Sequence, residues 1–147
     1  MNRRLTIWLI AAVFVGLCAS LPSVGAAGDV LIIANKDVPL SSLKRNEVKT
    51  IFLGKKTRWE SGQKINFVLS EVDTTHQNFI QTFIKRTPSQ YSRYWKKLVF
   101  TGKGRKPKSI KTDQGVVSYV ASTSGAIGYI STEAVSSDVK VLSVTAN

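Results

Sequence analysis

Short apolar runs rich in β-branched residues alternate along this chain with segments in which apolar residues recur at helical spacing. The runs at residues 29–34, 65–69, 126–130 and 139–144 predict strands, and the first is apolar enough to be buried on both faces. Four helix-patterned segments lie between these runs. The order is strand, helix, strand, three helices, strand, turn and strand, which indicates an α/β fold. We expect a single three-layer α/β/α lobe with a mixed sheet.

The first predicted helix follows a turn-forming stretch, Asn35–Pro39. Ser41 or Ser42 is expected to cap its start, and Gly54 to end it. Its apolar stripe consists of Leu43, Val48, Ile51 and Phe52. This spacing predicts that one face of the helix packs against the sheet.

The start of the chain has the composition of a secretory signal peptide. A positively charged N-terminus precedes a mostly apolar segment, residues 5–21, and small residues at 24–27 offer a cleavage site. The alternative, an uncleaved membrane anchor, is disfavoured because the apolar segment is short for a span. We therefore expect residues 1–27 to be removed on export, leaving a domain of residues 28–147 in the periplasm or outside the cell.

The expected mature chain has 147 − 27 = 120 residues, enough for one domain with its own core. The single cysteine, Cys18, lies in the leader, so neither a disulfide nor a cysteine-ligated metal is expected. Arg3 and Arg4 also leave with the leader, which changes the formal net charge from +12 to 12 − 2 = +10.

This positive charge predicts an acidic partner, such as a phosphorylated or carboxylated ligand, lipid headgroups or an envelope polysaccharide. No nucleic acid partner is expected for an exported protein. Two basic segments stand out, the loop Lys55–Trp59 with its one aromatic residue and the Gly- and Pro-containing stretch Phe100–Lys111. Each is interpreted as a solvated surface, and the second as a mobile loop.

The segment Phe67–Phe79 is the candidate ligand site. It predicts the end of a buried strand, a polar turn and a helix that begins near Asp73. Ligands of open α/β sheets bind at the carboxyl ends of strands, and a helix start offers unpaired N–H groups to an anion. Ser70, Asp73, Thr74 and Thr75 are therefore the candidate ligand-binding residues. The alternative is that Asp73 caps the helix with its own carboxylate.

The residues of a familiar catalytic or metal site are missing from the sequence. The single histidine, His76, has no neighbouring histidine or cysteine with which to hold a metal. Glu71 and Asp73 are the only close pair of acids, and no partner base accompanies them. No nucleophile elbow, phosphate loop or dinucleotide fingerprint occurs. We expect no enzymatic activity, no metal site and no cofactor.

Several motifs resemble those of the periplasmic phosphate-binding proteins of ABC transporters. The most specific is Ser124–Ile130, with the sequence Ser-Gly-Ala-Ile-Gly-Tyr-Ile. The others, in chain order, are Asn35 after a strand, Ile51–Lys55 with Trp59, Phe79 with Phe83, and Trp95 followed by Phe100–Gly102. The resemblance extends from about Val30 to Val144 and implies a type 2 periplasmic-binding-protein-like fold.

The resemblance implies only one lobe of these two-lobed proteins, the second. In that lobe the family binds phosphate through an arginine- and serine-containing turn, which aligns here with residues 69–76. Leu69 stands at the arginine position, Asp73 at a ligand serine and Thr74 at a glycine, whereas Thr75 keeps its residue type. Loss of the arginine removes a charge-assisted clamp, and the carboxylate of Asp73 would repel an anion.

Two functions follow as expectations. The first is an exported solute-binding module that holds phosphate or another small anion, with membrane components of an ABC transporter or another envelope protein as partner. A homodimer could rebuild the two-lobed cleft. The alternative is an accessory protein that has lost its ligand and contacts a protein or an acidic envelope polymer through its basic face.

Overall fold

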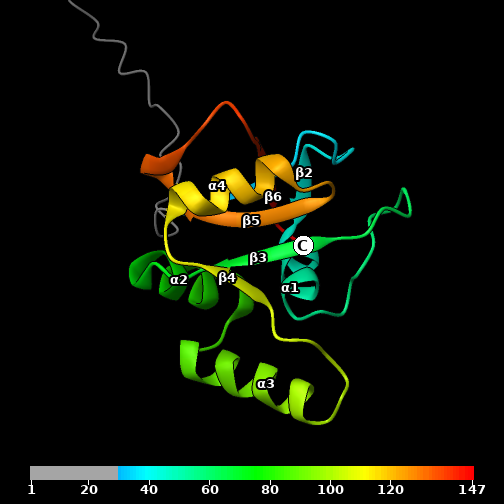
Figure 1. Cartoon of the computed structure of the whole chain (residues 1–147), viewed down its shortest axis with the longest axis vertical. Coiled ribbons are helices and arrows are strands. Elements are labelled where there is room, and N and C mark those ends of the chain that lie inside the picture. Colours follow the sequence, from blue (N-terminus) through cyan, green and yellow to red (C-terminus); the bar gives the residue numbers. More distant parts are fainter. Residues whose placement is uncertain (1–29) are drawn as a thin grey trace, which may run out of the picture.

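The computed structural model describes residues 30–147, which form a six-stranded sheet with helices on both faces (Figure 1). The strand order across the sheet is β2-β6-β1-β5-β3-β4. The strands are β1 (Val30–Ala34), β2 (Ser42–Lys44), β3 (Asn66–Ser70), β4 (Lys108–Ile110), β5 (Ala126–Ser131) and β6 (Lys140–Thr145). This arrangement confirms the predicted single α/β/α lobe with a mixed sheet. The proposed signal peptide lies outside the described residues.

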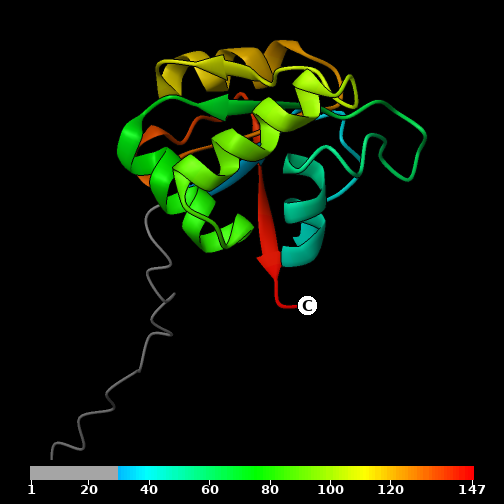
Figure 2. The ribbon, with the colours of Figure 1, turned by 90° about the horizontal axis from the view of Figure 1, so that it is seen from below.

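The helices are divided unequally between the two faces. Only α4 covers one face, whereas α1, α2 and α3 lie on the other (Figures 1 and 2). Their bounds are α1 (Arg45–Phe52), α2 (Asp73–Phe79), α3 (Pro88–Phe100) and α4 (Asp113–Ser122). A π-helical turn η1 (Ile80–Ile84) continues α2, and a 3₁₀ turn η2 (Thr132–Ala134) follows β5. No helix within residues 30–147 is long and apolar enough to cross a membrane.

Five of the six strands run in one direction, because β1 is antiparallel to both of its neighbours and every other pair is parallel. The register places Val30, at the start of β1, opposite Ser131, at the end of β5. One end of the sheet therefore contains the carboxyl ends of five strands and the amino end of β1.

The two faces of β1 lead to two separate cores. Ile32 belongs to the core under α1, α2 and α3, whereas Ile33 belongs to the core under α4. Both side chains are buried, which confirms that the strand is buried on both faces. The larger core contains an aromatic cluster in which Phe79 stacks on Tyr129 at 3.8 Å between ring centroids, and Phe52 meets both rings edge-on.

The start of the first helix differs from the prediction. Ser42 lies in β2 rather than at a helix cap, because Leu43 is buried between two exposed neighbours and the strand pairs with β6. Lys44 is the residue that precedes α1, and its backbone N–H donates to the Glu47 carboxylate at 3.1 Å. The predicted apolar stripe is nevertheless buried, and the turn after the helix contains Gly54 at a positive φ of 71°.

Two segments interpreted as solvated surface are partly built into the fold. Residues 108–110, expected in a mobile loop, form the edge strand β4 beside β3. Trp59, expected in a surface loop, is 2% exposed, and its indole N–H donates to the carbonyl of Gly125 at 3.1 Å. In both cases pairing with a distant segment decided the structure, and local composition did not reveal it.

Candidate functional site

The carboxyl ends of β3 and β5 are joined by a short hydrogen-bond network. Asp113, the first residue of α4, accepts hydrogen bonds from the Ser131 backbone N–H at 3.1 Å and from the Ser131 hydroxyl at 2.7 Å. The Ser70 hydroxyl donates weakly to Asp113 at 3.5 Å and accepts from the Val72 N–H at 3.2 Å. Ser70 is 1% exposed, so it holds the turn in place from within the protein.

The start of α2 lies directly after this turn. Val72, not Asp73, is the capping residue, and no side chain accepts a hydrogen bond there from the N–H groups of the first turn. The first N–H groups of an α-helix have no partner within the helix, so those of Asp73, Thr74 and Thr75 are available to an anion. The alternative, in which Asp73 caps the helix with its own carboxylate, is therefore wrong.

The four candidate residues do not all face the same space. Ser70 and Asp73 line a groove beside the strand ends. The Thr74 side chain is exposed and the Thr75 side chain is 4% exposed, and neither lines the groove. The structure thus brings Ser70 and Asp73 together, whereas Thr74 and Thr75 can contribute only their backbone N–H groups on that side.

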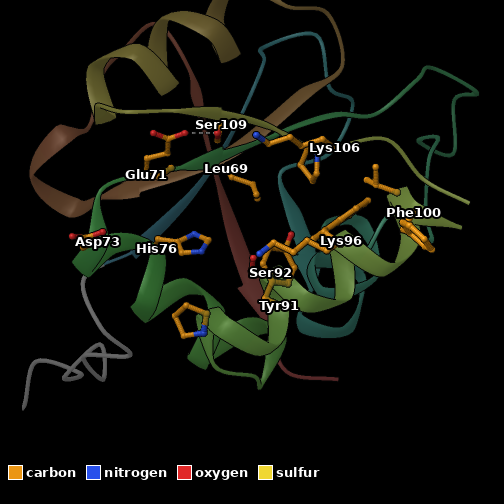
Figure 3. Close-up of a pocket in the computed structure, with 15 residues that line it drawn as sticks. Leu69, Glu71, Asp73, His76, Tyr91, Ser92, Lys96, Phe100, Lys106 and Ser109 are labelled. Carbon is orange, nitrogen blue, oxygen red and sulfur yellow. Dashed lines mark hydrogen bonds between the residues drawn. The ribbon is translucent and has the colours of Figure 1, made fainter. Parts of the chain in front are cut away.

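The groove has a volume of about 700 Å³ and runs between α3 and the strands β3 and β4. Its walls are mainly apolar and include Leu69, Tyr91, Trp95 and Val99. Figure 3 shows Glu71, Asp73 and His76 toward one end and Phe100 at the other, with Lys96 and Lys106 on opposite walls. A phosphate ion would fill only a small part of this volume.

Carboxylates dominate the end of the groove near α2. Glu71 and Asp73 are both exposed there, and Glu71 accepts a short hydrogen bond from the Ser109 hydroxyl. Leu69, at the position where the resemblance places an arginine, contributes only apolar surface to the lining. The N–H groups of α2 would attract an anion, and these carboxylates would oppose it.

His76 extends from α2 toward the core and contacts Tyr129. Its Nδ1 lies 2.6 Å from the Tyr129 hydroxyl, and the two rings stack with centroids 6.2 Å apart. Burial lowers the pKa of His76 below its usual value, although the Asp73 carboxylate acts in the opposite direction. Burial also raises the pKa of Tyr129 well above its usual value. Neutral His76 and the protonated Tyr129 hydroxyl therefore share one hydrogen bond through Nδ1.

The lowered pKa of His76 predicts that the folded protein loses stability as the pH falls below about 6.5, the ordinary pKa of histidine. Because the pKa is lower in the folded protein, the unfolded chain takes up a proton first, and protonation favours unfolding. We expect the melting temperature to fall by a few degrees between pH 7.5 and pH 5.5.

The matched variant is His76→Gln, which keeps a polar group and removes the titration. Since His76 is the only histidine of the chain, the melting temperature of this variant should be nearly constant over the same range. An equal pH dependence in the wild type and the variant would exclude His76 as the cause. The measurement is thermal unfolding followed by circular dichroism in buffers of equal ionic strength.

The sequence did not reveal the wall formed by α3. The helical spacing of Tyr91, Trp95 and Val99 predicts one buried face, and Tyr91 and Trp95 are indeed buried. Their outer edges nevertheless line the groove, and Val99 is 42% exposed. A helical stripe identifies the inward face but not whether another element covers it completely.

Within the part of the chain that the structure describes, no three His, Cys, Asp or Glu side chains gather closely enough to hold a metal ion. His76 also lines the groove, and its Nδ1 is hydrogen-bonded to the Tyr129 hydroxyl. What the site offers is backbone N–H groups, hydroxyls and apolar surface, which suit binding.

An α/β lobe with a mixed sheet and a groove at the carboxyl ends of its strands is the architecture of one half of a periplasmic-binding-protein-like domain. The chain belongs to this class by sequence as well: the family model described as "PBP superfamily domain" matches residues 25–145, and the chain is a member of that superfamily. No curated protein matched the chain.

Several solved structures have a similar fold. An ABC-type phosphate transport receptor from Vibrio cholerae is 18% identical with a TM-score of 0.60, and 79% of this chain matches 46% of the receptor. A putative phosphate ABC transporter substrate-binding protein from Clostridium perfringens, solved with bound phosphate, is 21% identical with a TM-score of 0.62, and 79% of this chain matches 44% of it.

PstS from Borrelia burgdorferi is 17% identical with a TM-score of 0.52, and the match covers 80% of this chain and 47% of PstS. The chain therefore spans less than half the length of each of these proteins. At these identities the likeness establishes the fold, and it confirms that the chain corresponds to a single lobe.

Proposed function

We propose that the protein is an exported solute-binding module that holds a small phosphate-like anion weakly at the start of α2. In this proposal residues 1–27 are a cleaved signal peptide and residues 28–147 are the binding domain in the periplasm. Membership of the PBP superfamily supports the binding role. The single observation that carries the anion site is the uncapped start of α2 at the carboxyl end of β3, where Asp73, Thr74 and Thr75 offer their N–H groups.

The carboxylates near this site lower its affinity for an anion. Two like charges about 5 Å apart repel by about 3 kcal/mol at an effective dielectric constant of 20. Asp73 lies at the site itself, and Leu69 supplies no compensating positive charge. The proposal therefore predicts weak binding by the natural protein and tighter binding once the carboxylate of Asp73 is removed.

The partner in this proposal is the membrane component of an ABC transporter or another envelope protein. The structural similarity to a phosphate transport receptor and to a putative phosphate ABC transporter substrate-binding protein supports a transport role. A single lobe presents one wall of a cleft, and in this proposal a second copy of the lobe supplies the facing wall. Sedimentation velocity with and without phosphate distinguishes a ligand-induced homodimer from a monomer.

The decisive experiment is isothermal titration of the exported protein with phosphate at low and moderate salt. We expect Asp73→Ser to bind at least roughly tenfold more tightly than the wild type because it removes the nearest repelling charge. Glu60→Ser is the matched control, because Glu60 is exposed and lies outside the groove. Its affinity should equal that of the wild type.

No saturable heat from either the wild type or Asp73→Ser would reject the anion site. Equal improvement in Asp73→Ser and Glu60→Ser would also reject it, since net charge rather than position would then govern binding. Neutralising Lys97, Lys103 and Arg105, which are exposed and lie outside the groove, should leave the phosphate affinity at moderate salt unchanged.

A further inference from the structure

Positive charge is concentrated in one continuous part of this chain. Between Asp73 and Asp113 there is no Asp or Glu. The same interval contains ten basic residues: Lys85, Arg86, Arg93, Lys96, Lys97, Lys103, Arg105, Lys106, Lys108 and Lys111. Protein surfaces ordinarily intersperse charges of both signs, so a segment of this length with one sign only calls for an acidic partner.

The densest part of this segment is the end of α3 and the loop that follows it. We call Lys96, Lys97, Lys103, Arg105 and Lys106 the cationic rim; all five side chains are exposed. Within residues 30–147 the single ion pair joins Lys56 to Glu47, so no carboxylate neutralises the rim. Lys108 is not included because its ammonium lies over the Tyr119 ring, 5.2 Å from the centroid.

An exposed aromatic residue stands within the cationic rim. Phe100, the last residue of α3, is 93% exposed, and its neighbour Val99 is 42% exposed. Lys96 and Lys97 precede Phe100 by four and three residues, which places them beside it on the helix surface. Figure 3 shows Phe100 at the end of the groove, beyond Lys96 and Lys106.

The position of Phe100 is fixed by the turn that ends α3. The N–H groups of Thr101 and Gly102 donate to the carbonyls of Lys97 and Val99 at 3.0 and 3.1 Å. Lys103 and Gly104 both donate to Leu98, at 2.9 and 3.2 Å. These bonds close the helix end, so the exposure of Phe100 belongs to an ordered turn rather than to a frayed end.

We propose that the cationic rim and Phe100 dock the protein on a bilayer that contains anionic phospholipid. The basic side chains would lie among the phosphate groups, and Phe100 would enter the boundary between headgroups and acyl chains. This combination of clustered Lys and Arg with an exposed aromatic residue is the pattern that binds membrane interfaces. A second copy of this chain fits the surface poorly, since two cationic rims would repel each other.

The basic residues and Phe100 contribute separately to the proposed membrane binding. Each basic residue near an anionic bilayer adds roughly fivefold to the partition coefficient, and this contribution weakens with salt. Insertion of one large apolar side chain adds roughly tenfold and depends little on salt. A soluble acidic polymer would respond to the basic residues but would provide no apolar layer for Phe100.

The test is flotation of the exported protein with lipid vesicles, after its N-terminus has been determined by mass spectrometry. One set of vesicles contains phosphatidylglycerol and phosphatidylcholine, and the other contains phosphatidylcholine alone. The first variant combines Lys103→Gln, Arg105→Gln and Lys106→Gln. The matched control combines Lys36→Gln, Lys55→Gln and Lys64→Gln, which removes three exposed charges elsewhere on the protein.

We expect binding to the anionic vesicles, a loss of roughly 100-fold in the first triple variant, and a much smaller loss in the control. Phe100→Ser should bind roughly tenfold less tightly and keep the salt dependence of the wild type. Equal binding to both kinds of vesicle, or equal loss in the two triple variants, would overturn the proposal.

A further arm uses soluble heparin as an acidic polymer without a bilayer. If heparin binds as tightly as the anionic vesicles and Phe100→Ser binds both like the wild type, the surface serves an acidic polymer and the membrane proposal fails. This outcome is independent of phosphate binding at α2, because inorganic phosphate is titrated separately and in the absence of vesicles.

Discussion

Gly125→Ala should lower the melting temperature of this protein by roughly 10–20 °C. Gly125 has a positive φ of 66°, and a Cβ at this position would lie 2.2 Å from the backbone carbonyl oxygen of Lys64. Backbone cannot move aside as a flexible side chain can, so the substitution must displace one of the segments that meet here. We expect a cost of about 3–5 kcal/mol in the free energy of unfolding.

The cost is large because Gly125 connects three separate parts of the chain. Its N–H donates to Asp37 at 3.1 Å, and its carbonyl accepts from the Trp59 indole at 3.1 Å and from the Asn66 N–H at 3.2 Å. Displacing the Gly125 backbone therefore weakens the anchoring of the turn after β1, the buried Trp59 and the start of β3 at the same time.

The Gly102→Ala variant measures the cost of the left-handed backbone conformation in the absence of a steric clash. Gly102 has almost the same φ, 69°, but a Cβ there would meet no atom within 4 Å. Its replacement should cost only about 1 kcal/mol, the strain of the left-handed conformation. Equal melting temperatures for the two variants would show that conformation alone matters and that the contact with Lys64 does not.

Phe79→Ala should cost about 3–5 kcal/mol in urea unfolding. The Phe79 ring is fully buried and lies parallel to Tyr129, with an interplanar angle of 4°. Its edge contact with Phe52 has a centroid separation of 4.7 Å. Truncation would leave a cavity between α2, α1 and β5, and would remove the contact that holds α2 against the sheet.

Phe100→Ala is the same chemical change at an exposed position. Because Phe100 is 93% exposed, this variant should differ from the wild type by no more than about 0.5 kcal/mol. A large destabilisation by Phe100→Ala would contradict the exposure on which the membrane proposal rests. A small effect of Phe79→Ala would show that the aromatic cluster repacks around the missing ring.

The motifs that carried the family resemblance turn out to build the scaffold. In Ser124–Ile130, the Ser124 hydroxyl donates to Asp37 at 2.6 Å, Gly125 joins three segments, and Tyr129 stacks on Phe79. A Cβ on Gly128 would lie 3.0 Å from Val116 and 3.3 Å from Val120, both on α4, so this glycine lets α4 approach the sheet. Packing restricts such residues to few alternatives, which is why they remained recognisable in the sequence.

Asn35 has a similar structural role. Its side-chain amide donates to the carbonyls of Val120, Ala121 and Thr123 at 2.9–3.0 Å and thereby caps the end of α4. Strands β1, β3, β5 and β6, the four helices and most apolar core residues could be predicted because each has a local periodic signal.

The groove and the edge strands could not be predicted in this way. Residues 42–44 and 108–110 are too short to show a period, and each becomes a strand only because β6 or β3 lies beside it. The groove depends on how far α3 stands from the sheet edge, which no local pattern encodes. The alternative in which the Asp73 carboxylate caps α2 is not realised, although Asp73 is a favourable capping residue, because Asp73 is the first residue of the helix and Val72 precedes it as the cap.

The antiparallel direction of β1 determines which part of the protein lies next to an attachment at its amino end. Val30 enters the sheet opposite Ser131, and Ser131 shares Asp113 with Ser70 at the candidate site. An attachment made just before residue 30 would therefore turn this end of the sheet, with the candidate site, toward the support. It would thereby restrict diffusion to the candidate site. Assays on immobilised protein are best made with the linkage elsewhere, because a bead coupled at the amino end would obstruct the groove.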